Sequence, residues 1–401
     1  MGPKVSIIIP VYNGSNYMRD AIDSALNQTY DNCEVIVIND GSTDNGQTEE
    51  IAKSYGDRIR YFYKENGGVA TAVNLGIEKM TGDYFAWLSH DDMFTPDKIE
   101  KQILAAEAAG ETEAIVHSNF EFWRVEENVR AKVNWLDQYT REQMETGCFA
   151  PVFLAIHGST VLIHKSHFQR VGVYDTKLRA TQDSEFLFRV MRGKRSVFVE
   201  DSLMISRIHK EQGQQTMSCH GPEYNQMFVG FCDALSEKEK CDLAGSVCNF
   251  YYRLYLLLKY SKPAKEILEY LKEKITATKD TECKEKGISL RNTWRQKGIK
   301  EVYIFGAGQY GKEMLLTLNN YETEIDGFID NSSEKQGTMV NGKPCFGPEH
   351  IYKKEDALVI VAMASTEAVM EQLNRNAVCK RTTIGKIKKE FFKVLPSRIE
   401  L

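Results

Sequence analysis

The sequence predicts an α/β protein in which two α/β domains are joined by helices. From residue 4 to about 118, short apolar β-branched runs alternate with segments of helical period, which is typical of a mostly parallel sheet covered by helices. Residues 222 to about 297 are helical in period, and strand–helix alternation returns at Lys300. A chain of 401 residues has room for two or three such domains.

We therefore expect an α/β domain at residues 1–220, a helical connector at 221–298 and a smaller Rossmann-like domain at 299–401. Hydrophobic residues make up 42% and charged residues 27% of the chain, which favours a globular protein over a disordered one. The net charge of −5 gives no indication of nucleic-acid binding. An anionic ligand would have to be held by local charges.

In the first domain, the initial strand at residues 4–11 precedes a helix with its apolar residues on one face. The elements expected after it are strands 34–39, 59–63 and 84–88, a helix from 69 to about 80, a strand at 159–164 and a helix at 184–191. The polar stretch between about 119 and 160 has no clear period. It is left unassigned.

Acidic residues follow two of the predicted strands. Asp40 comes after the second strand and the pair Asp91–Asp92 after a later one, at the edge where open α/β sheets bind ligands. Paired carboxylates can hold a divalent cation. The alternatives are structural: Asp40 and Asp44 suit a turn and a helix cap, and Asp91–Asp92 could start a helix before Pro96.

Four motifs together resemble the ordered signature of family 2 glycosyltransferases, whose fold is called GT-A. They are Val5–Asn13, Ile38–Asp44, Asn66–Ala70 with Asn74 and Gly76, and Ser89–Asp92. Four motifs in order are far more specific than one, and the resemblance covers residues 4 to about 215. It implies an inverting, metal-dependent glycosyltransferase of hexosyltransferase type, with a nucleotide-diphosphate sugar as donor, UDP favoured. The acceptor would be a hydroxyl of a saccharide, a lipid-linked oligosaccharide or a glycoprotein.

The resemblance also implies roles by position. The donor-nucleotide residues are Pro10, Val11, Tyr12, Asn13, Asp40, Asn66, Gly68 and Asp91, with Asp40 at the position that pairs with the uracil edge. Asp92 matches the metal-binding end of its motif, and His209 is a further candidate ligand for Mn²⁺ or Mg²⁺. Such a cation would stabilise the leaving diphosphate. One departure is Val73, which stands where many members have an arginine that helps to hold the diphosphate.

Asp183, in the segment Thr181–Phe186, resembles the catalytic base of the family. An inverting transfer needs a group that takes the acceptor's proton on the face opposite the leaving diphosphate. The alternative interpretation is a helix cap, with Glu185 as a first-turn charge. Trp123 and Trp135 are candidates for stacking on a sugar, although aromatic residues more often serve packing.

A second glycine motif begins the C-terminal domain. Gly306, Gly308 and Gly311 follow a strand, and Asp330 ends the next strand, which is the context of a dinucleotide-type fold. The domain resembles small Rossmann-like modules attached to sugar-modifying enzymes such as sugar acetyltransferases. These four residues are a candidate second nucleotide site, and an assembly role for the domain is the alternative.

The nine scattered cysteines and the lack of a long apolar run predict a cytoplasmic protein with reduced thiols and no membrane-spanning helix. The basic last twenty residues, with an apparent apolar face, could contact a membrane surface, although docking on the chain's own domain is the commoner outcome. Self-association is an open option.

Two other functions compete with the enzyme. The first is a non-catalytic nucleotide-sugar-binding scaffold assembled through the C-terminal domain, against which the retention of both Asp92 and Asp183 argues. The second is an NAD-dependent oxidoreductase built on the C-terminal glycine motif, but no Tyr-x-x-x-Lys pair accompanies that motif.

Overall fold

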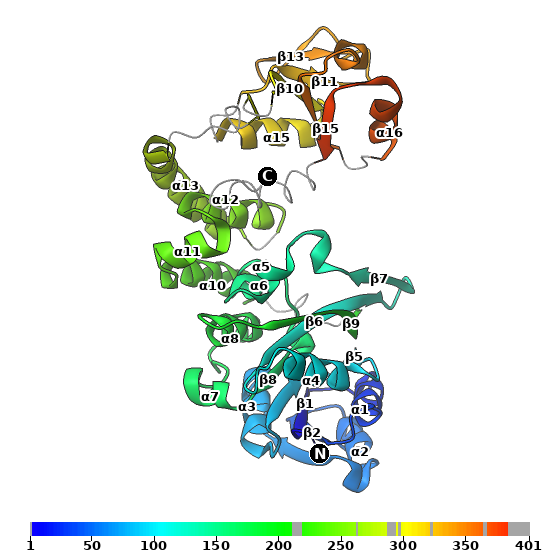
Figure 1. Cartoon of the computed structure of the whole chain (residues 1–401). Helices are drawn as coiled ribbons and strands as arrows, with labels where there is room; N and C mark the ends of the chain where they lie inside the picture. Colours follow the sequence, from blue (N-terminus) through cyan, green and yellow to red (C-terminus); the bar gives the residue numbers. More distant parts are fainter. Residues whose placement is uncertain are drawn as a thin grey trace. The chain divides into compact units, whose positions relative to one another are not determined.

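The computed structural model describes residues 2–210, 219–261, 264–286, 294–295, 298–320, 324–363 and 367–383 (Figure 1). The chain divides into two compact units. The first consists of residues 1–234 and 260–267, and the second of residues 235–259 and 268–401. Both units are α/β, so the predicted fold class is confirmed. The three-part division at residues 220 and 298 stays a prediction.

Within the described part of the first unit, nine strands form one mostly parallel sheet in the order β3-β2-β1-β4-β8-β6-β9-β5, with β7 paired to β6. Strands β1 to β4 run parallel to one another, whereas β8 is antiparallel to β4 and β6. The strands are β1 (Val5–Val11), β2 (Cys33–Asp40), β3 (Arg60–Lys64), β4 (Tyr84–Trp87), β5 (Met93–Phe94), β6 (Ile115–Arg124), β7 (Val129–Val133), β8 (Leu162–His164) and β9 (Val197–Ile208).

The helices of this unit include the crossovers between β1, β2, β3 and β4 that a parallel sheet requires. They are α1 (Met18–Leu26), α2 (Gln47–Lys53), α3 (Val69–Lys79), α4 (Lys98–Ala108), α5 (Arg141–Glu145), α6 (Phe149–Val152), α7 (Ser166–Val171), α8 (Gln182–Met191) and α10 (His220–Ala234), together with short 3₁₀ turns at Gly56–Arg58, Trp135–Asp137 and Gly158–Thr160. The C-terminal ends of β1, β2 and β4 therefore share one edge of the sheet.

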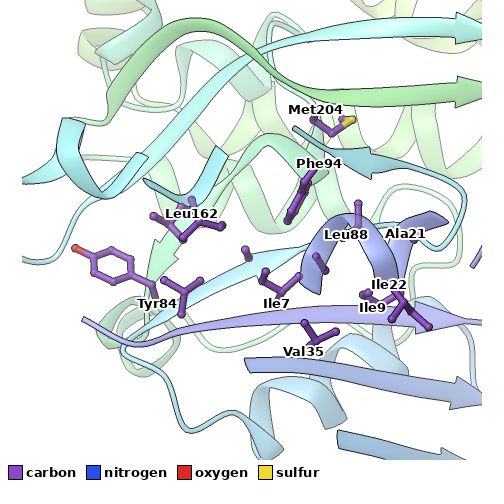
Figure 2. Packing of buried hydrophobic residues seen from close by; sticks show 14 of the residues in the cluster. Ile7, Ile9, Ala21, Ile22, Val35, Tyr84, Leu88, Phe94, Leu162 and Met204 are labelled. Carbon is purple, nitrogen blue, oxygen red and sulfur yellow. The ribbon is translucent and has the colours of Figure 1, made fainter. Parts of the chain in front are cut away.

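The two faces of β1 explain its unbroken apolar run. Ile7 and Ile9 point into a core that includes Ile22 of α1, and all three are fully buried (Figure 2). On the other face, a Cβ on Gly76 of α3 would lie 2.4 Å from Cγ2 of Ile8. Only glycine lets the helix pack this closely on the strand. Gly76 in the predicted motif therefore serves packing.

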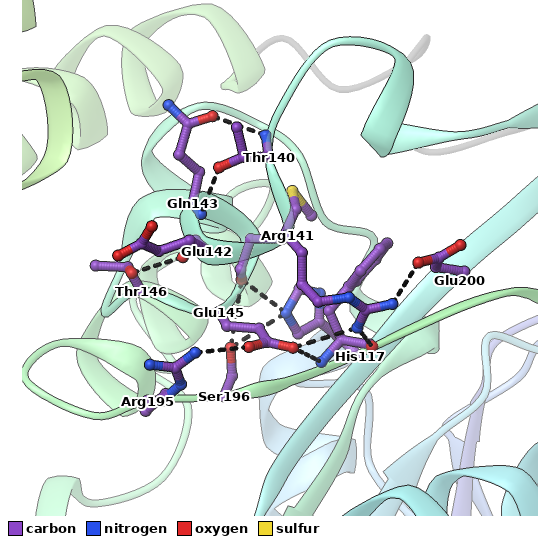
Figure 3. Close-up of polar contacts among 12 residues, drawn as sticks. His117, Thr140, Arg141, Glu142, Gln143, Glu145, Thr146, Arg195, Ser196 and Glu200 are labelled. Atoms are coloured by element: carbon purple, nitrogen blue, oxygen red, sulfur yellow. Dashed lines mark hydrogen bonds and ion pairs between the residues drawn. The ribbon is translucent and has the colours of Figure 1, made fainter. Parts of the chain in front are cut away.

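The stretch that the sequence left unassigned contains β7, α5 and α6. Helix α5 begins with a capping box in which Gln143 N donates to Thr140 Oγ1 and Thr140 N donates to Gln143 Oε1 (Figure 3). His117 Nε2 lies 3.0 Å from Met144 O, and burial lowers the pKa of His117 to about 4. Arg141 donates to Phe198 O at 2.7 Å. Long-range contacts to β6 and β9 thus place α5, which no local period could reveal.

Lys98 of α4 carries an amine into the core. Its Nζ donates to Gln102 Oε1 at 2.6 Å and lies 4.3 Å from the centroid of the Phe94 ring. Gln102 Nε2 in turn donates to Thr160 O at 2.7 Å. Burial lowers the pKa of Lys98 to about 7. Between that value and its ordinary pKa, the amine is neutral in the folded protein and protonated in the unfolded chain.

Folding stability should therefore gain a component that rises with pH between about 7 and 10, because the unfolded chain binds the extra proton there. One such group contributes a slope of up to about 1.4 kcal/mol per pH unit. Lys98→Met is expected to lose this slope, and Lys79→Met, at the end of α3, to keep it. Urea unfolding near pH 7 and pH 10 measures the slopes. Equal slopes in the wild type and both variants would contradict the assignment.

In the second unit, the described residues form a six-stranded sheet in the order β12-β13-β11-β10-β14-β15. The strands are β10 (Glu301–Phe305), β11 (Gly327–Ile329), β12 (Met339–Val340), β13 (Lys343–Phe346), β14 (Ala357–Val361) and β15 (Lys380–Thr383). The helices are α11 (Glu237–Ala244), α12 (Val247–Leu258), α13 (Lys265–Lys286, which starts in the first unit), α15 (Gln309–Asn320) and α16 (Glu367–Asn376), with a 3₁₀ turn at Pro348–Ile351.

Across the described ranges, no helix is both long enough and apolar enough to cross a membrane. The basic C-terminal segment that was considered for membrane contact or for docking on its own domain falls largely on residues 384–401, which lie outside the described residues.

Candidate functional site

The carboxyl ends of β1 and β2 are tied together by side chains. Pro10 and Val11 are buried at the end of β1, whereas Tyr12 is 44% exposed. Asn13 has a φ of +49°. Its backbone N donates to Ser42 Oγ at 2.9 Å, and its Oδ1 accepts from Thr43 N at 2.7 Å. The left-handed backbone of Asn13 thus turns the chain at the sheet edge and leaves the Tyr12 ring accessible there.

Asp40 lies at the end of β2 and organises the loop that follows β3. Its Oδ1 pairs with Lys64 Nζ at 2.5 Å and accepts from Gly67 N at 3.0 Å, and its Oδ2 accepts from Gly68 N at 2.8 Å. The Asp40 side chain is only 4% exposed. A carboxylate can accept about four hydrogen bonds, so one acceptor position remains after these three.

The loop at Asn66–Gly68 packs against the turn after β2. A Cβ on Gly41, which has a φ of +70°, would lie 2.5 Å from Asn66 N. Gly68 has a φ of +91° and precedes α3. The structure therefore brings the predicted donor residues Asn66 and Gly68 beside Asp40. Their contact with a nucleotide stays a prediction.

Asp91 and Asp92 lie in a turn after β4, where Asp92 N donates to Ser89 O at 3.1 Å. No helix starts at this pair, because β5 comes first and α4 begins at Lys98. Asp91 Oδ2 lies 3.1 Å from Nε2 of His209, which follows β9. The predicted metal candidate His209 is thus brought to Asp91. Both side chains are largely buried.

The carboxylate of Asp92 is engaged elsewhere. Its Oδ1 accepts from Arg207 N at 3.0 Å, and its Oδ2 lies 3.5 Å from Ser159 Oγ. The Arg207 side chain is 2% exposed; its Nη1 donates to Asp91 O at 3.2 Å and its Nη2 pairs with Asp20. Arg207 therefore holds Asp92 by its carboxylate and Asp91 by its main-chain oxygen.

The two carboxylates respond differently to this surrounding. In Asp91, burial raises the pKa, but the hydrogen bond from His209 and the charge of His90 outweigh it and lower the pKa overall. In Asp92, burial and the charge of Asp91 raise the pKa well above its usual range, against the hydrogen bond from Arg207 N. A cation placed beside the pair would relieve this repulsion.

The residues fit a cation that obtains part of its ligands from elsewhere. Among the described residues, no three His, Cys, Asp or Glu side chains are grouped closely enough to hold a metal ion. Asp91 and His209 supply two ligand types that are already in contact, and His209 Nδ1 is buried without a hydrogen-bond partner in the described structure. Mg²⁺ and Mn²⁺ commonly complete such a set with water and phosphate oxygens.

Asp183 is the second residue of α8, whose N-cap is Thr181. It lies beside the turn at Gly158, because a Cβ on that glycine would be 3.5 Å from Asp183 Oδ2 and 3.1 Å from the Trp87 ring. Burial raises the pKa of Asp183, although backbone hydrogen bonds and His220 act in the opposite direction. A raised pKa makes the carboxylate a better proton acceptor than an ordinary aspartate.

Gly158 connects Asp183 with the tandem carboxylates. The next residue, Ser159, contacts Asp92, and its backbone N donates to Nδ1 of His157 at 3.2 Å. Burial lowers the pKa of His157 to about 4. His157 therefore shapes this turn as a neutral side chain. The turn places the predicted base and the predicted metal residues at one site.

Trp123 is poorly placed to stack on a sugar. The guanidinium carbon of Arg207 lies 5.2 Å and that of Arg130 lies 4.6 Å from the centre of the Trp123 ring, so guanidinium groups already stack on this ring. Trp135 packs between Phe120 and Tyr139. Both tryptophans thus serve packing, which was the alternative interpretation.

Lys64 is a cation of this site that the sequence analysis did not identify. Lys64 stands directly opposite Asp40 in the parallel register of β2 and β3. A lysine at a strand end beside a strand-end aspartate is a signal that could have found it. The position of Arg207 beside Asp91 depends on the pairing of β9 with β5, which the sequence alone does not reveal.

In the second unit, the glycine motif forms a tight turn. A Cβ on Gly311 would lie 1.7 Å from Gly306 O, and Gly306 has a φ of +106°. Asp330 Oδ2 accepts from Ala307 N at 2.8 Å and from Lys335 Nζ at 3.0 Å. The structure thus brings Gly306, Gly311 and Asp330 together, with Asp330 holding the turn. Nucleotide binding by them and by Gly308 stays a prediction.

A mostly parallel sheet with carboxylates along its C-terminal edge is the arrangement at which open α/β proteins commonly bind ligands. The family model "Glycosyl transferase family 2" matches residues 6–172, and the model "C2185-like, N-terminal" matches residues 298–384. An uncharacterized glycosyltransferase of Rickettsia typhi is 42% identical over 257 residues, which cover 64% of this chain and 80% of the relative. The chain belongs to glycosyl transferase family 2, and the resemblance stated above is confirmed.

Other relatives are longer than this chain. An uncharacterized glycosyltransferase of Rickettsia conorii is 38% identical over 336 residues, which cover 82% of this chain and 54% of the relative. The match to an uncharacterized glycosyltransferase of Rickettsia felis covers 44% of that relative. The chain therefore spans about half the length of these two proteins. Among solved structures, S. aureus TarS 1–349 in complex with UDP-GlcNAc matches with 14% identity and a TM-score of 0.49, over 72% of this chain and 93% of that chain.

Proposed function

We propose that the first unit is a metal-dependent, inverting glycosyltransferase that moves a sugar from a nucleotide-diphosphate donor, with UDP favoured, to a hydroxyl group of an acceptor. Membership of glycosyl transferase family 2 supports the class of reaction. The observation that carries the proposal is the turn at Gly158–Ser159, which joins Asp183 to Asp92. These two contacts support a site in which a proton acceptor and a diphosphate-binding edge would face one reaction centre.

The nucleoside end of the donor belongs at the ends of β1 and β2. Pro10, Val11, Tyr12 and Asn13 would line it from β1, and Asp40, Asn66 and Gly68 from β2 and the loop after β3. The exposed Tyr12 ring offers a stacking surface for a base. The remaining acceptor position of Asp40 would take an N–H of the base.

The diphosphate belongs near Asp91, Asp92 and His209. Asp91 and His209 would hold Mn²⁺ or Mg²⁺ as ligands, and Asp92 is a further ligand candidate whose oxygens are now engaged by Arg207 and Ser159. When bound, the cation would stabilise the negative charge of the departing diphosphate. Arg207 keeps the two aspartates in place.

Asp183 would act as the general base. Its carboxylate takes the proton of the acceptor hydroxyl while the acceptor oxygen forms a bond to the anomeric carbon of the sugar. The bond between that carbon and the diphosphate oxygen breaks on the opposite face, so the configuration inverts. The acceptor would be a saccharide, a lipid-linked oligosaccharide or a glycoprotein. The second unit would serve assembly or hold a second nucleotide at Gly306–Gly311.

The proposal is tested by incubating the purified chain and Mn²⁺ with UDP-, GDP- and dTDP-hexoses and a set of oligosaccharide acceptors. We expect release of one nucleoside diphosphate together with a glycoside whose anomeric configuration, measured by NMR, is opposite to that of the donor. Retention of configuration would refute the inverting mechanism. Nucleotide binding without turnover of any donor would instead favour the non-catalytic scaffold.

A further inference from the structure

The segment between Tyr174 and α8 is fastened at its first end to helix α3. Asn74 Nδ2 donates to Tyr174 O at 2.8 Å, and Tyr174 N donates to Asn74 Oδ1 at 3.0 Å. The Tyr174 side chain is buried and its ring stacks on Phe186 of α8. The start of the segment is therefore fixed to the helix that begins next to Gly68.

The other end is fastened by Glu223 of α10. One carboxylate accepts from three consecutive backbone N–H groups: Arg179 N at 3.0 Å, Ala180 N at 2.8 Å and Thr181 N at 3.3 Å. Burial raises the pKa of Glu223, but these hydrogen bonds outweigh it and lower the pKa overall. Glu223 thus fixes the backbone immediately before Asp183. It lies beyond residues 6–172, which the family model matches.

This arrangement directs the side chain of Arg179 onto the loop beside Asp40. Arg179 Nη1 donates to Gly67 O at 2.7 Å. A Cβ on Gly68 would lie 2.9 Å from Nη1 and 3.1 Å from Cζ of Arg179, so the guanidinium lies directly against the glycine. The backbone N–H groups of Gly67 and Gly68 are the ones that donate hydrogen bonds to the carboxylate of Asp40. The guanidinium therefore borders the proposed nucleoside end of the site.

The backbone of Arg179 leads to the other end of the proposed site, since only three residues separate it from Asp183. In a nucleotide sugar the diphosphate lies between nucleoside and sugar. A cation between Asp40 and Asp183 is thus placed where the diphosphate would run. The residue is exposed, and no carboxylate in the described part of the chain forms an ion pair with its guanidinium. Its remaining N–H groups form a planar fork that suits phosphate oxygens.

We propose that Arg179 binds the diphosphate of the donor nucleotide and that Glu223 is the positioning residue that orients it. This inference rests on the proposed function of the first unit. It also accounts for Val73, which is fully buried in α3 and supplies no charge to the diphosphate. The cation then comes from the segment before α8.

The test is calorimetric titration of UDP, UMP and uridine into the purified full chain with Mn²⁺. Arg179→Gln should weaken UDP binding by about tenfold or more, as expected for the loss of a charge-assisted hydrogen bond, and leave uridine binding unchanged. Arg179→Lys should retain part of the UDP affinity. Arg195 is an exposed arginine just before β9 that pairs with Glu145 of α5, so Arg195→Gln removes the same charge and should bind UDP like the wild type.

Glu223→Gln alone should weaken UDP binding, but it should have little further effect when it is added to Arg179→Gln, because Glu223 acts through Arg179. Additive losses would show that Glu223 acts independently and would overturn its positioning role. Unchanged UDP affinity in Arg179→Gln would overturn the role of Arg179 while leaving the proposed function intact. A wild type that binds no UDP, even though it transfers sugar from another donor, would refute the inference for a uridine donor. A wild type that neither binds nor turns over any nucleotide donor would refute both proposals.

Discussion

Asp183→Asn is expected to reduce sugar transfer by about 10²–10⁴-fold, the usual contribution of a general base, while donor affinity stays near the wild-type value. The physical reason is the position of the carboxylate, which lies beside Gly158 and has its pKa raised by burial. An asparagine of nearly the same shape keeps the packing but cannot take the acceptor's proton. Transfer rates and nucleotide titration of the same variant measure the two quantities separately.

Glu185→Gln provides the matched control, because Glu185 lies on the same turn of α8 and is paired with Arg189. It should transfer sugar at close to the wild-type rate.

The raised pKa of Asp183 also predicts that wild-type activity falls off on the acid side at a pH above the ordinary aspartate value of about 3.9, because the base must be deprotonated. Wild-type activity in Asp183→Asn would remove Asp183 from this role.

Asp91→Asn is expected to abolish the dependence of UDP binding on Mn²⁺ and to reduce transfer by orders of magnitude. Asp91 is the carboxylate in contact with His209, and the pair supplies an oxygen and a nitrogen ligand. An amide oxygen is neutral, so the variant loses much of its attraction for the cation. The measurement is UDP titration with and without Mn²⁺ in the wild type and the variant.

Asp92→Asn separates the two interpretations of the tandem carboxylates. The sequence assigned the metal to Asp92, whereas the structure places the imidazole of His209 against Asp91. If Asp92 mainly holds the turn through Arg207 and Ser159, Asp92→Asn should retain part of the Mn²⁺ coupling. If the dependence of UDP binding on Mn²⁺ were unchanged in Asp91→Asn and lost in Asp92→Asn, Asp92 would be the cation ligand.

The parts of the fold that repeat a local period were predictable from the sequence. Strand β1 was expected within one residue of its observed bounds, because its apolar run is buried on both faces. Helix α3 was expected from residue 69 to about 80 on its helical period and is observed at Val69–Lys79. Helix α5 was not, because its five residues are held by contacts to His117, Phe198 and Glu200, which lie far away in the sequence.

The candidate site shows the same division. Asp40, Asp91 and Asp92 could be found because they follow strands, where the topology of a parallel sheet brings chemistry together. The partners that determine their state could not: the pairing of His209 with Asp91 rather than Asp92 depends on how β9 passes the turn after β4. Glu223 could not be found either, since it stands more than forty residues from the backbone that it holds.

The central claim is that the first unit binds a nucleotide diphosphate with the help of a divalent cation. The most direct measurement is calorimetric titration of UDP, GDP, dTDP and NAD into the purified chain, each with and without Mn²⁺. We predict saturable binding of a nucleoside diphosphate, with UDP the tightest, that strengthens with Mn²⁺ and loses this coupling in Asp91→Asn. Binding of NAD alone, or nucleotide binding that Mn²⁺ leaves unchanged in the wild type, would contradict the account.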